Sequence, residues 1–368
     1  MKYKLNFTDL GRQYGNIKSE ILKNIEEVLE STKYINGPQV SMLEQEIANY
    51  TGVKYAIGVG SGTDALLISL MAFDIKPGEE IITTPFTFIA TAEVISLLGA
   101  KPVFVDIDEK SFNIDVNQIE EKITNRTRGI IPVHLYGQMA EMDKIMEITK
   151  KYNLFVIEDA AQAMGSEYKN KKAGSIGDTG CFSFFPAKNL GAYGDAGMIV
   201  TNNKNLADKI RILREHGSAK KYQHQYIGIN GRLDTLQAAI LLVKVKYLDS
   251  YIDNRIKLAK NYSEQLKDYV RVPEILPDRK HTFNQFTIRT EKRDQLQKYL
   301  ESNGIPTAIH YPMPLHLQPC FKYLGYEEGE FPVAEKISKE VLSLPMFPEM
   351  TEEEQNMVID TIISFFKK

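Results

Sequence analysis

One lysine stands in a glycine-rich turn directly after an apolar stretch of the chain. Residues 181–185 are typical of a buried β-strand, Pro186 breaks the strand pattern, and Lys188 follows. An ε-amine forms an imine only when it is unprotonated, which requires partial desolvation of the nitrogen. A turn at a strand end beside aromatic side chains supplies that desolvation and leaves the amine accessible. Most lysines are solvated surface charges, but this setting predicts a Schiff-base lysine.

A carboxylate ends another apolar stretch. Residues 154–159 have the composition of a buried strand that closes on Asp159, and Gln162 follows. Ligands of open α/β sheets gather at the carboxyl ends of strands. An aspartate there can pair with a protonated pyridine nitrogen and make the ring an electron sink, as pyridoxal phosphate requires, and Gln162 can reach the 3-oxygen of that ring. Asp159 could instead be the N-cap of a following helix.

A strand, a turn of small residues and a helix follow one another over residues 55–70. A helix that begins near Thr63 presents unpaired backbone N–H groups and the positive end of its dipole to an anion, and Gly62 lets a phosphate approach closely. The segment therefore predicts a phosphate-binding cup. It nearly matches the dinucleotide-binding fingerprint, but Thr63 replaces the third glycine, and the Gly-Lys-Ser/Thr of a P-loop is absent.

Aromatic residues follow the strand expected at residues 80–84. Phe88 could stack on a flat cofactor ring. An aromatic side chain at a strand–helix junction can also belong to the hydrophobic core, so the position alone leaves both roles open.

Four motifs together give the chain a specific resemblance over nearly its whole length. They are Gly-Thr-Asp-Ala-Leu at residues 62–66, Glu-Asp-Ala-Ala-Gln at 158–162, the lysine turn at 183–195 and Asn-Gly-Arg-Leu-Asp-Thr-Leu-Gln-Ala-Ala at 230–239. This set resembles the DegT/DnrJ/EryC1/StrS family of sugar aminotransferases. The lysine turn and residues 310–318 resemble the members that aminate carbon 3 of a nucleotide-linked ketosugar. Members that act at carbon 4 usually carry a histidine in the lysine turn and a Thr-Gly-Glu-Gly run after it, which this chain lacks.

The resemblance implies a role for each matching position. Lys188 would hold pyridoxal 5'-phosphate as a Schiff base and later move the proton, Asp159 and Gln162 would contact the pyridine ring, and Phe88 would stack on it. The cofactor phosphate would be held by Gly62, Thr63 and Ser183, with Asn230 reaching in from a second subunit of a homodimer. Asn230 could instead cap the helix expected near Leu233. The substrate would be faced by Tyr222, His224, Arg232, His310 and Tyr311.

The resemblance also implies a reaction. It is the transfer of an amino group from L-glutamate to a 3-keto sugar on UDP (2-acetamido-3-keto-glucose or -glucuronate) or on dTDP (3-keto-6-deoxyhexose), for surface polysaccharide or related glycoconjugates. Three alternatives stay open: a sugar dehydratase or deoxygenase, whose relatives characteristically have histidine in place of Lys188; a nicotinamide-dependent dehydrogenase built on the cup at residues 58–63; and a non-enzymatic regulator.

Composition limits the class of protein. A chain of 368 residues accommodates one large and one smaller domain. A net charge of −3 without a long basic run gives no electrostatic footprint for nucleic acid or an anionic membrane. Two cysteines, Cys181 and Cys320, cannot build a disulfide framework or, with six scattered histidines, a convincing zinc site. We therefore expect no bound metal. The first residues lack the apolar stretch of a leader peptide, so we expect a cytoplasmic protein.

Short apolar stretches alternate with helical patterns over residues 54–201, and this alternation predicts an α/β fold. With the family resemblance, we expect the fold-type-I architecture. Strands that recur with helices between them indicate a mostly parallel sheet with helices on both faces. We expect a large cofactor-binding domain at residues 1–250 and a small α+β C-terminal domain at 251–368, with one long helix at 233–256 bridging them. The strands are expected at residues 56–59, 81–84, 103–105, 129–134, 154–157, 182–185, 198–201 and 284–289. Further helices are expected at 17–31, 295–302, 333–341 and 352–366.

Overall fold

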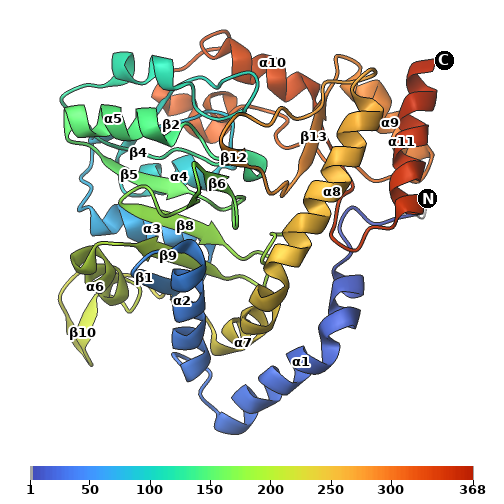
Figure 1. The fold of residues 1–368 in the computed structure, drawn as a ribbon. Helices are drawn as coiled ribbons and strands as arrows, with labels where there is room; N and C mark the ends of the chain where they lie inside the picture. The colour runs from blue at the N-terminus through green and yellow to red at the C-terminus, as the bar shows by residue number, and fades with distance from the viewer. Residues whose placement is uncertain (1–2, 368) are drawn as a thin grey trace.

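A seven-stranded sheet forms the centre of the protein (Figure 1), whose computed structural model describes residues 3–367. The strand order is β1-β9-β8-β5-β4-β2-β3. Only β9 runs antiparallel to its neighbours, and the other adjacent pairs are parallel. The mostly parallel sheet is thus confirmed. Its strands are β1 (Tyr55–Val59), β2 (Glu80–Thr83), β3 (Lys101–Phe104), β4 (Thr127–Ile130), β5 (Phe155–Asp159), β8 (Thr179–Ser183) and β9 (Gly197–Thr201).

Helices cover both faces of the sheet because successive side chains of each strand point to opposite sides. On β5, Val156 belongs to the buried cluster that contains residues of α2, α5 and α7, whereas Ile157 belongs to the cluster that contains residues of α3, α4 and α6. Both residues are fully buried. The helices on the first face are α2 (Pro38–Thr51), α5 (Met142–Tyr152) and α7 (Thr235–Lys244); those on the second are α3 (Gly62–Ala72), α4 (Ala90–Leu97) and α6 (Lys204–Leu213).

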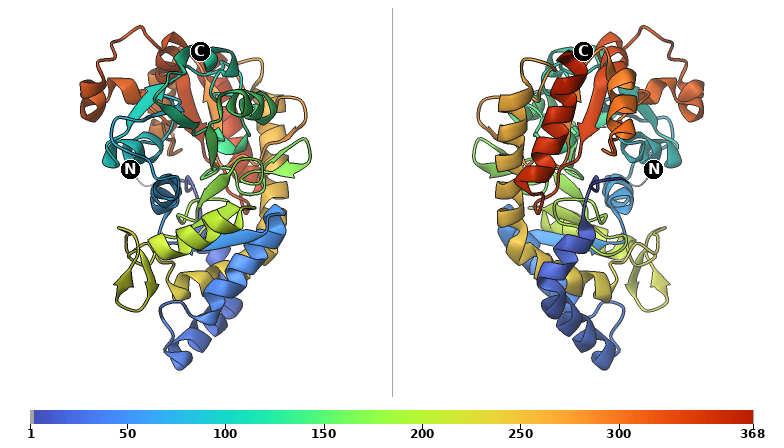
Figure 2. Two further views of the ribbon diagram at one scale, coloured as in Figure 1. Left: turned by 90° about the vertical axis from the view of Figure 1, so that its left-hand side faces the viewer. Right: turned by 90° about the vertical axis from the view of Figure 1, so that its right-hand side faces the viewer.

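The C-terminal part packs around an antiparallel strand pair, β13 (Phe286–Arg289) and β14 (Val341–Leu344). Leu5 belongs to the same buried cluster as residues of α8, α9 and α11. Figure 2 shows the C-terminal end of the chain and the blue segment that joins α1 to α2 at opposite ends of the molecule. The remaining helices are α1 (Leu10–Ser31), α8 (Leu248–Leu266), α9 (Arg293–Ser302), α10 (Pro332–Glu340) and α11 (Glu352–Lys367). Short strands are β6 (Glu167–Tyr168), β7 (Lys171–Lys172), β10 (Ser218–Lys220), β11 (Gln223–His224) and β12 (Arg279–Lys280). The 3-10 helices are η1 (Val116–Gln118), η2 (Glu120–Lys122), η3 (Leu135–Gly137), η4 (Val245–Tyr247), η5 (Leu315–Leu317) and η6 (Pro319–Leu324).

Several expected elements differ from the structure. The helix expected at residues 17–31 begins earlier, at Leu10, and the strand expected at 182–185 is β8, which spans Thr179–Ser183. The helix expected at residues 233–256 is two helices, α7 and α8, which the 3-10 helix η4 separates. The strand expected at 129–134 ends earlier, at Ile130, although Val133 still forms a parallel bridge to Asp159. The helix expected at 333–341 ends at Glu340, and Val341 begins β14, a strand the sequence interpretation missed.

Two further expectations concern the whole chain. We retain the division into residues 1–250 and 251–368 as a proposal, with α8 crossing the boundary; residues 1, 2 and 368 lie outside the described part. Within residues 3–367, no helix combines the length and the apolar composition that a membrane crossing requires.

Candidate active site

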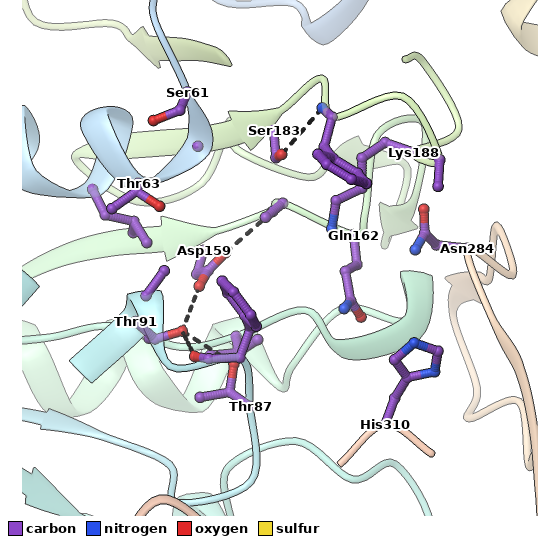
Figure 3. Close-up of a pocket in the computed structure, with 18 of the residues that line it drawn as sticks. Ser61, Thr63, Thr87, Thr91, Asp159, Gln162, Ser183, Lys188, Asn284 and His310 are labelled. Atoms are coloured by element: carbon purple, nitrogen blue, oxygen red, sulfur yellow. Dashed lines mark hydrogen bonds between the residues drawn. The ribbon is translucent and has the colours of Figure 1, made fainter. Parts of the chain in front are cut away.

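A cavity of about 480 Å³ lies where β5 and β8 end and α3 begins. Figure 3 shows Asp159 and Gln162 between the turn that carries Ser61 and Thr63 and the group formed by Lys188, Asn284 and His310. Segments that are more than a hundred residues apart in the sequence therefore meet at the carboxyl edge of the sheet. Nine of the residues predicted for the site line this cavity: Gly62, Thr63, Phe88, Asp159, Gln162, Ser183, Lys188, His310 and Tyr311.

Asp159 is the last residue of β5, and its side chain is 5% exposed. Its Oδ2 accepts a hydrogen bond from Thr91 Oγ1 at 2.7 Å, and its Oδ1 accepts one from the Ala161 N–H at 3.2 Å. Burial raises the pKa of this carboxyl group, whereas the two hydrogen bonds and the positive charge of Lys188 oppose that rise. No helix begins here, so the alternative of a helix N-cap is wrong. A buried carboxylate of this kind stabilises a nearby positive charge.

Lys188 projects from a tightly closed turn. The Lys188 N–H donates to Phe185 O at 2.9 Å, and the Ala192 N–H donates to Phe184 O at 2.8 Å. The turn needs glycine at residue 191, because a Cβ there would lie 2.2 Å from Pro186 O. Among the described residues, the Lys188 Nζ has no hydrogen-bond or ion-pair partner. Burial lowers the pKa of the amine to about 8, and the charge of Asp159 partly opposes this shift. An unprotonated, nucleophilic amine is therefore accessible near neutral pH.

The phosphate cup is formed by the first turn of α3. Ser61 is the N-cap, and its Oγ accepts a hydrogen bond from the Asp64 N–H at 3.0 Å. The N–H groups of Gly62 and Thr63 have no acceptor among the described residues, as expected for the start of a helix. A Cβ on Gly62 would lie 2.7 Å from Ser183 Cβ, so the helix start and the end of β8 are in close contact. This concave end of a helix suits a phosphate.

Gln162 and Tyr311 both line the cavity and are joined by a hydrogen bond. The Gln162 Oε1 accepts a hydrogen bond from the Tyr136 N–H at 2.7 Å, and its Nε2 donates to Tyr311 Oη at 3.1 Å. Burial raises the pKa of the Tyr311 phenol above its usual range, so the hydroxyl remains protonated. Phe88 is 55% exposed, and its ring centroid lies 6.3 Å from that of Tyr311. Phe88 is thus not a core residue in the isolated chain.

His310 is held by the C-terminal part of the chain. Its Nδ1 lies 2.8 Å from Ser343 Oγ, and the main-chain oxygen of His310 accepts a hydrogen bond from the Tyr136 hydroxyl. Burial lowers the pKa of the imidazole to about 4, and the positive charge of Lys188 acts in the same direction. His310 is therefore neutral at pH 7 and available for hydrogen bonding.

Four predicted site residues lie outside the cavity of this chain. Tyr222 is 83% exposed, and His224 Nδ1 lies 2.8 Å from His216 O. Arg232 forms an ion pair with Glu215 at 3.3 Å, and Asn230 forms a β-bridge with Glu215. The N-cap of α7 is Asp234, so the alternative that Asn230 caps this helix is wrong. Within one chain, Tyr222, His224, Asn230 and Arg232 contribute nothing to the cavity.

The sequence interpretation assigned no role to several residues that line the cavity. Thr91 stands four residues after Thr87, and their hydroxyl oxygens lie 3.0 Å apart. Side chains four residues apart are neighbours on a helix, so a helix predicted to begin near residue 88 could have indicated that the two threonines lie together. Asn284 gave no local signal, because it lies far along the chain from the other site segments. The full set of unassigned lining residues is Ser61, Leu66, Thr87, Ala90, Thr91, Val133, Ala161, Phe185, Ala187, Asp195, Ala196, Asn284 and Gln285.

Comparison with known proteins gives a consistent result. Residues 15–363 match the sequence profile of the DegT/DnrJ/EryC1/StrS aminotransferase family. A "Pleiotropic regulatory protein" of Geobacillus stearothermophilus is 52% identical over 98% of both chains. A UDP-2-acetamido-2-deoxy-3-oxo-D-glucuronate aminotransferase of Pseudomonas aeruginosa is 46% identical over 94% of this chain and 95% of its own.

Two further similarities extend the comparison. A dTDP-3-amino-3,6-dideoxy-alpha-D-galactopyranose transaminase of Aneurinibacillus thermoaerophilus is 45% identical over 97% of this chain and 98% of its own. The crystal structure of NtdA from Bacillus subtilis with bound cofactor PMP superimposes with a TM-score of 0.93 at 35% identity, covering 100% of this chain and 86% of that one.

Proposed function

The chain belongs to the DegT/DnrJ/EryC1/StrS aminotransferase family, and on this premise we propose that it transfers the amino group of L-glutamate to carbon 3 of a nucleotide-linked 3-keto sugar. It is an aminotransferase that uses pyridoxal 5'-phosphate. The proposal rests on one observation: Lys188 and Asp159 line the same cavity, and burial lowers the pKa of the Lys188 amine to about 8. That combination suits a lysine that binds a carbonyl compound covalently.

The residues of the cavity fit the cofactor. The unpaired N–H groups of Gly62 and Thr63, together with Ser183, would hold the phosphate. Asp159 would stabilise the protonated ring nitrogen, and Phe88 and Gln162 would contact the ring. Pyridoxal phosphate, when bound, supplies an electrophilic carbonyl and an electron-withdrawing ring.

Lys188 supplies the proton transfer in this proposal. Its Nζ can bind or release a proton near neutral pH because its pKa is about 8. Asp159 is fixed by Thr91 and by the Ala161 N–H, so its charge stays at one place during turnover. The neutral imidazole of His310 and the protonated hydroxyl of Tyr311 would bind the sugar without bringing a net charge into the cavity.

The names of two relatives support two choices of nucleotide and sugar. The Pseudomonas aeruginosa enzyme is named for a UDP-linked N-acetylated sugar and the Aneurinibacillus thermoaerophilus enzyme for a dTDP-linked one, at nearly equal identity to this chain. A 3-amino sugar made from either would be a precursor for surface polysaccharide or related glycoconjugates. Of the two, we propose the UDP-linked N-acetylated sugar, because residues 310–318 resemble the matching segment of family members that act on UDP-linked N-acetylated sugars.

We propose that the active site is shared between two subunits of a homodimer. The hairpin of β10 and β11 projects from the body of the molecule (Figure 1), and the nearby Tyr222 and Ile227 are 83% and 91% exposed. Large apolar side chains at such exposure support contact with a second copy of the chain. In that dimer, Asn230 and Arg232 would reach the neighbour's cavity, which they do not line in their own chain.

An amination assay tests the proposed function. The purified enzyme is incubated with L-glutamate and each member of a panel of UDP- and dTDP-linked 3-keto sugars, and the product is identified by mass. We expect a 3-amino product from a UDP-linked N-acetylated sugar and none when glutamate is omitted. Amination of only the dTDP sugars would refute the UDP assignment, and no amination of any panel member would refute the proposal.

A regulatory role is the second candidate, because the relative from Geobacillus stearothermophilus carries a regulatory name. A Lys188→Ala variant separates the two roles. An enzyme loses its biological effect together with its catalytic lysine, whereas a scaffold retains it.

A further inference from the structure

A second lysine lies behind the turn that carries Lys188. Lys244, the last residue of α7, is 1% exposed, although its side chain ends in an ammonium group. Burial lowers the pKa of this amine to about 8, and the charge of Glu349 opposes the shift. Replacing a buried charged side chain by a well-packed apolar one of similar volume often leaves the stability of a protein unchanged or raises it. The presence of Lys244 therefore calls for a role other than filling the core.

The Nζ of Lys244 contacts the lysine turn directly. It donates a hydrogen bond to the main-chain oxygen of Gly191 at 2.5 Å, and it lies 5.1 Å from the centroid of the Tyr193 ring. Gly191 follows Lys188 by three residues, and a Cβ at this position would lie 2.2 Å from Pro186 O. Lys244 thus holds the end of the same turn from which Lys188 enters the cavity.

Helix α7 holds this turn at a second point. The Oε1 of Gln237 accepts a hydrogen bond from the Tyr193 N–H at 2.9 Å. Gln237 and Lys244 are seven residues apart, close to two helical turns, so their side chains lie on one face of α7. One rigid helix therefore sets the position of the turn through two side chains.

The charged and titratable groups around Lys244 come from four other segments. Glu349 bears the opposite charge and interacts with the side chain of Gln13 as well as with Lys244. Arg255 of α8 is 4% exposed and balances the same carboxylate. The remaining groups are the phenols of Tyr14 on α1, Tyr193 on the lysine turn and Tyr251 on α8.

We propose that Lys244 is a positioning residue for Lys188: by binding the Gly191 carbonyl oxygen, it fixes the turn that presents the reactive amine to the cofactor. The inference rests on the proposed role of Lys188. A displacement of about 1 Å in a reacting group is enough to lower turnover by roughly a hundredfold. The lysine acts through the main chain and does not line the cavity.

The test compares Lys244→Met with the wild-type holoenzyme. Met keeps the apolar part of the side chain and removes the donor. We expect kcat to fall by about tenfold or more while KM for the sugar changes by less than about threefold. The visible absorbance of the bound cofactor is also measured as a function of pH. We expect the midpoint of this titration to move by about half a pH unit or more. Lys246→Met is the matched control, since this lysine lies two residues away with a 62% exposed side chain and should change neither value.

Three outcomes overturn the inference. A folded Lys244→Met variant with wild-type kcat and midpoint, even at a lower Tm, would show that the lysine only supports the fold. If Lys244→Met does not fold, Lys244→Gln decides, because its amide is one atom shorter and should change both values in the same direction by less; wild-type values in that variant refute the role. A wild-type enzyme that gains no visible absorbance on incubation with pyridoxal phosphate refutes the role of Lys188 and this inference with it.

Discussion

At the scale of residues, the site depends on two buried groups, Lys188 and Asp159, whose pKa values are shifted by burial. Lys188 loses solvation, so its pKa falls to about 8, and Asp159 loses solvation, so its pKa rises. Each charge partly offsets the shift of the other. The pair therefore provides a nucleophile and a stabilising carboxylate within one cavity of about 480 Å³.

Lys188→Ala should abolish turnover while the fold persists. The change removes the proposed covalent attachment and proton carrier but little buried apolar area. We expect kcat to fall by at least about a thousandfold, measured in the glutamate-dependent assay, with loss of the imine absorbance. Lys169→Ala, on an exposed residue paired with Asp143, serves as the control and should behave as wild type. Turnover within about tenfold of wild type would rule out the assignment of Lys188.

Asp159→Asn should lose most of the rate and keep the cofactor. A neutral amide can still accept the hydrogen bond from Thr91 but cannot hold a ring nitrogen protonated by charge pairing. We expect kcat to fall by about a hundredfold or more, with the phosphate contacts at Gly62 and Thr63 unaffected. The measurement is kcat beside the amount of cofactor retained on gel filtration. An unchanged kcat would place the charge partner elsewhere.

At the scale of elements, the site is formed by the ends of strands and the start of a helix. The ends of β5 and β8 lie side by side because these strands are parallel neighbours, with Asp159 paired to Cys181. Helix α3 begins against the last residue of β8, where Gly62 contacts Ser183. The close packing of these two elements gives the phosphate cup its shape.

Gly62→Ala should weaken cofactor binding by displacing the start of α3 from β8. The new Cβ would lie 2.7 Å from Ser183 Cβ, closer than packed side chains allow. We expect the dissociation constant of pyridoxal phosphate to rise by about tenfold or more, equivalent to about 1.4 kcal/mol. Gly15→Ala is the matched control: nothing lies within 4 Å of a Cβ there, and alanine within α1 should raise the free energy of unfolding by about 0.5–1 kcal/mol. Equal cofactor affinity in both variants would contradict the assigned cup.

At the scale of the whole molecule, the cavity of one chain contains most of the proposed site residues, and the others lie on or near the exposed hairpin of β10 and β11. Asn230 and Arg232 lie outside the cavity, next to the hairpin of β10 and β11. A two-fold homodimer would place that surface of each subunit against the other. A cytoplasmic location also remains a prediction at this scale.

Complementation between two inactive variants tests the shared site. We expect Lys188→Ala and Asn230→Ala subunits, each impaired alone, to recover partial activity in a mixed dimer, because one of its two sites then receives both intact residues. The heterodimer is isolated with two different affinity tags and assayed against both parent homodimers. No recovery in verified heterodimers would show that Asn230 serves its own chain.

The sequence by itself determined the chemistry and the class of fold. Strand alternation with helices predicted the parallel sheet, and the local motifs around Lys188, Asp159 and Thr63 identified residues that the structure brings to one cavity. These signals are local: a strand end, a helix start and a turn each occupy a few consecutive residues. Hydrophobic patterns also placed most of the strands and helices that were predicted with bounds to within a few residues.

Only the tertiary structure decided which distant segments meet. The hydrogen bond from Thr91 to Asp159, the entry of Asn284 into the cavity and the contact between Lys244 and Gly191 all join segments at least 50 residues apart in the chain. The pKa of Lys188 likewise depends on the atoms that enclose it, which no local pattern specifies. Burial and hydrogen bonding are properties of packed elements, so their effects on a side chain become visible only once those elements have assembled.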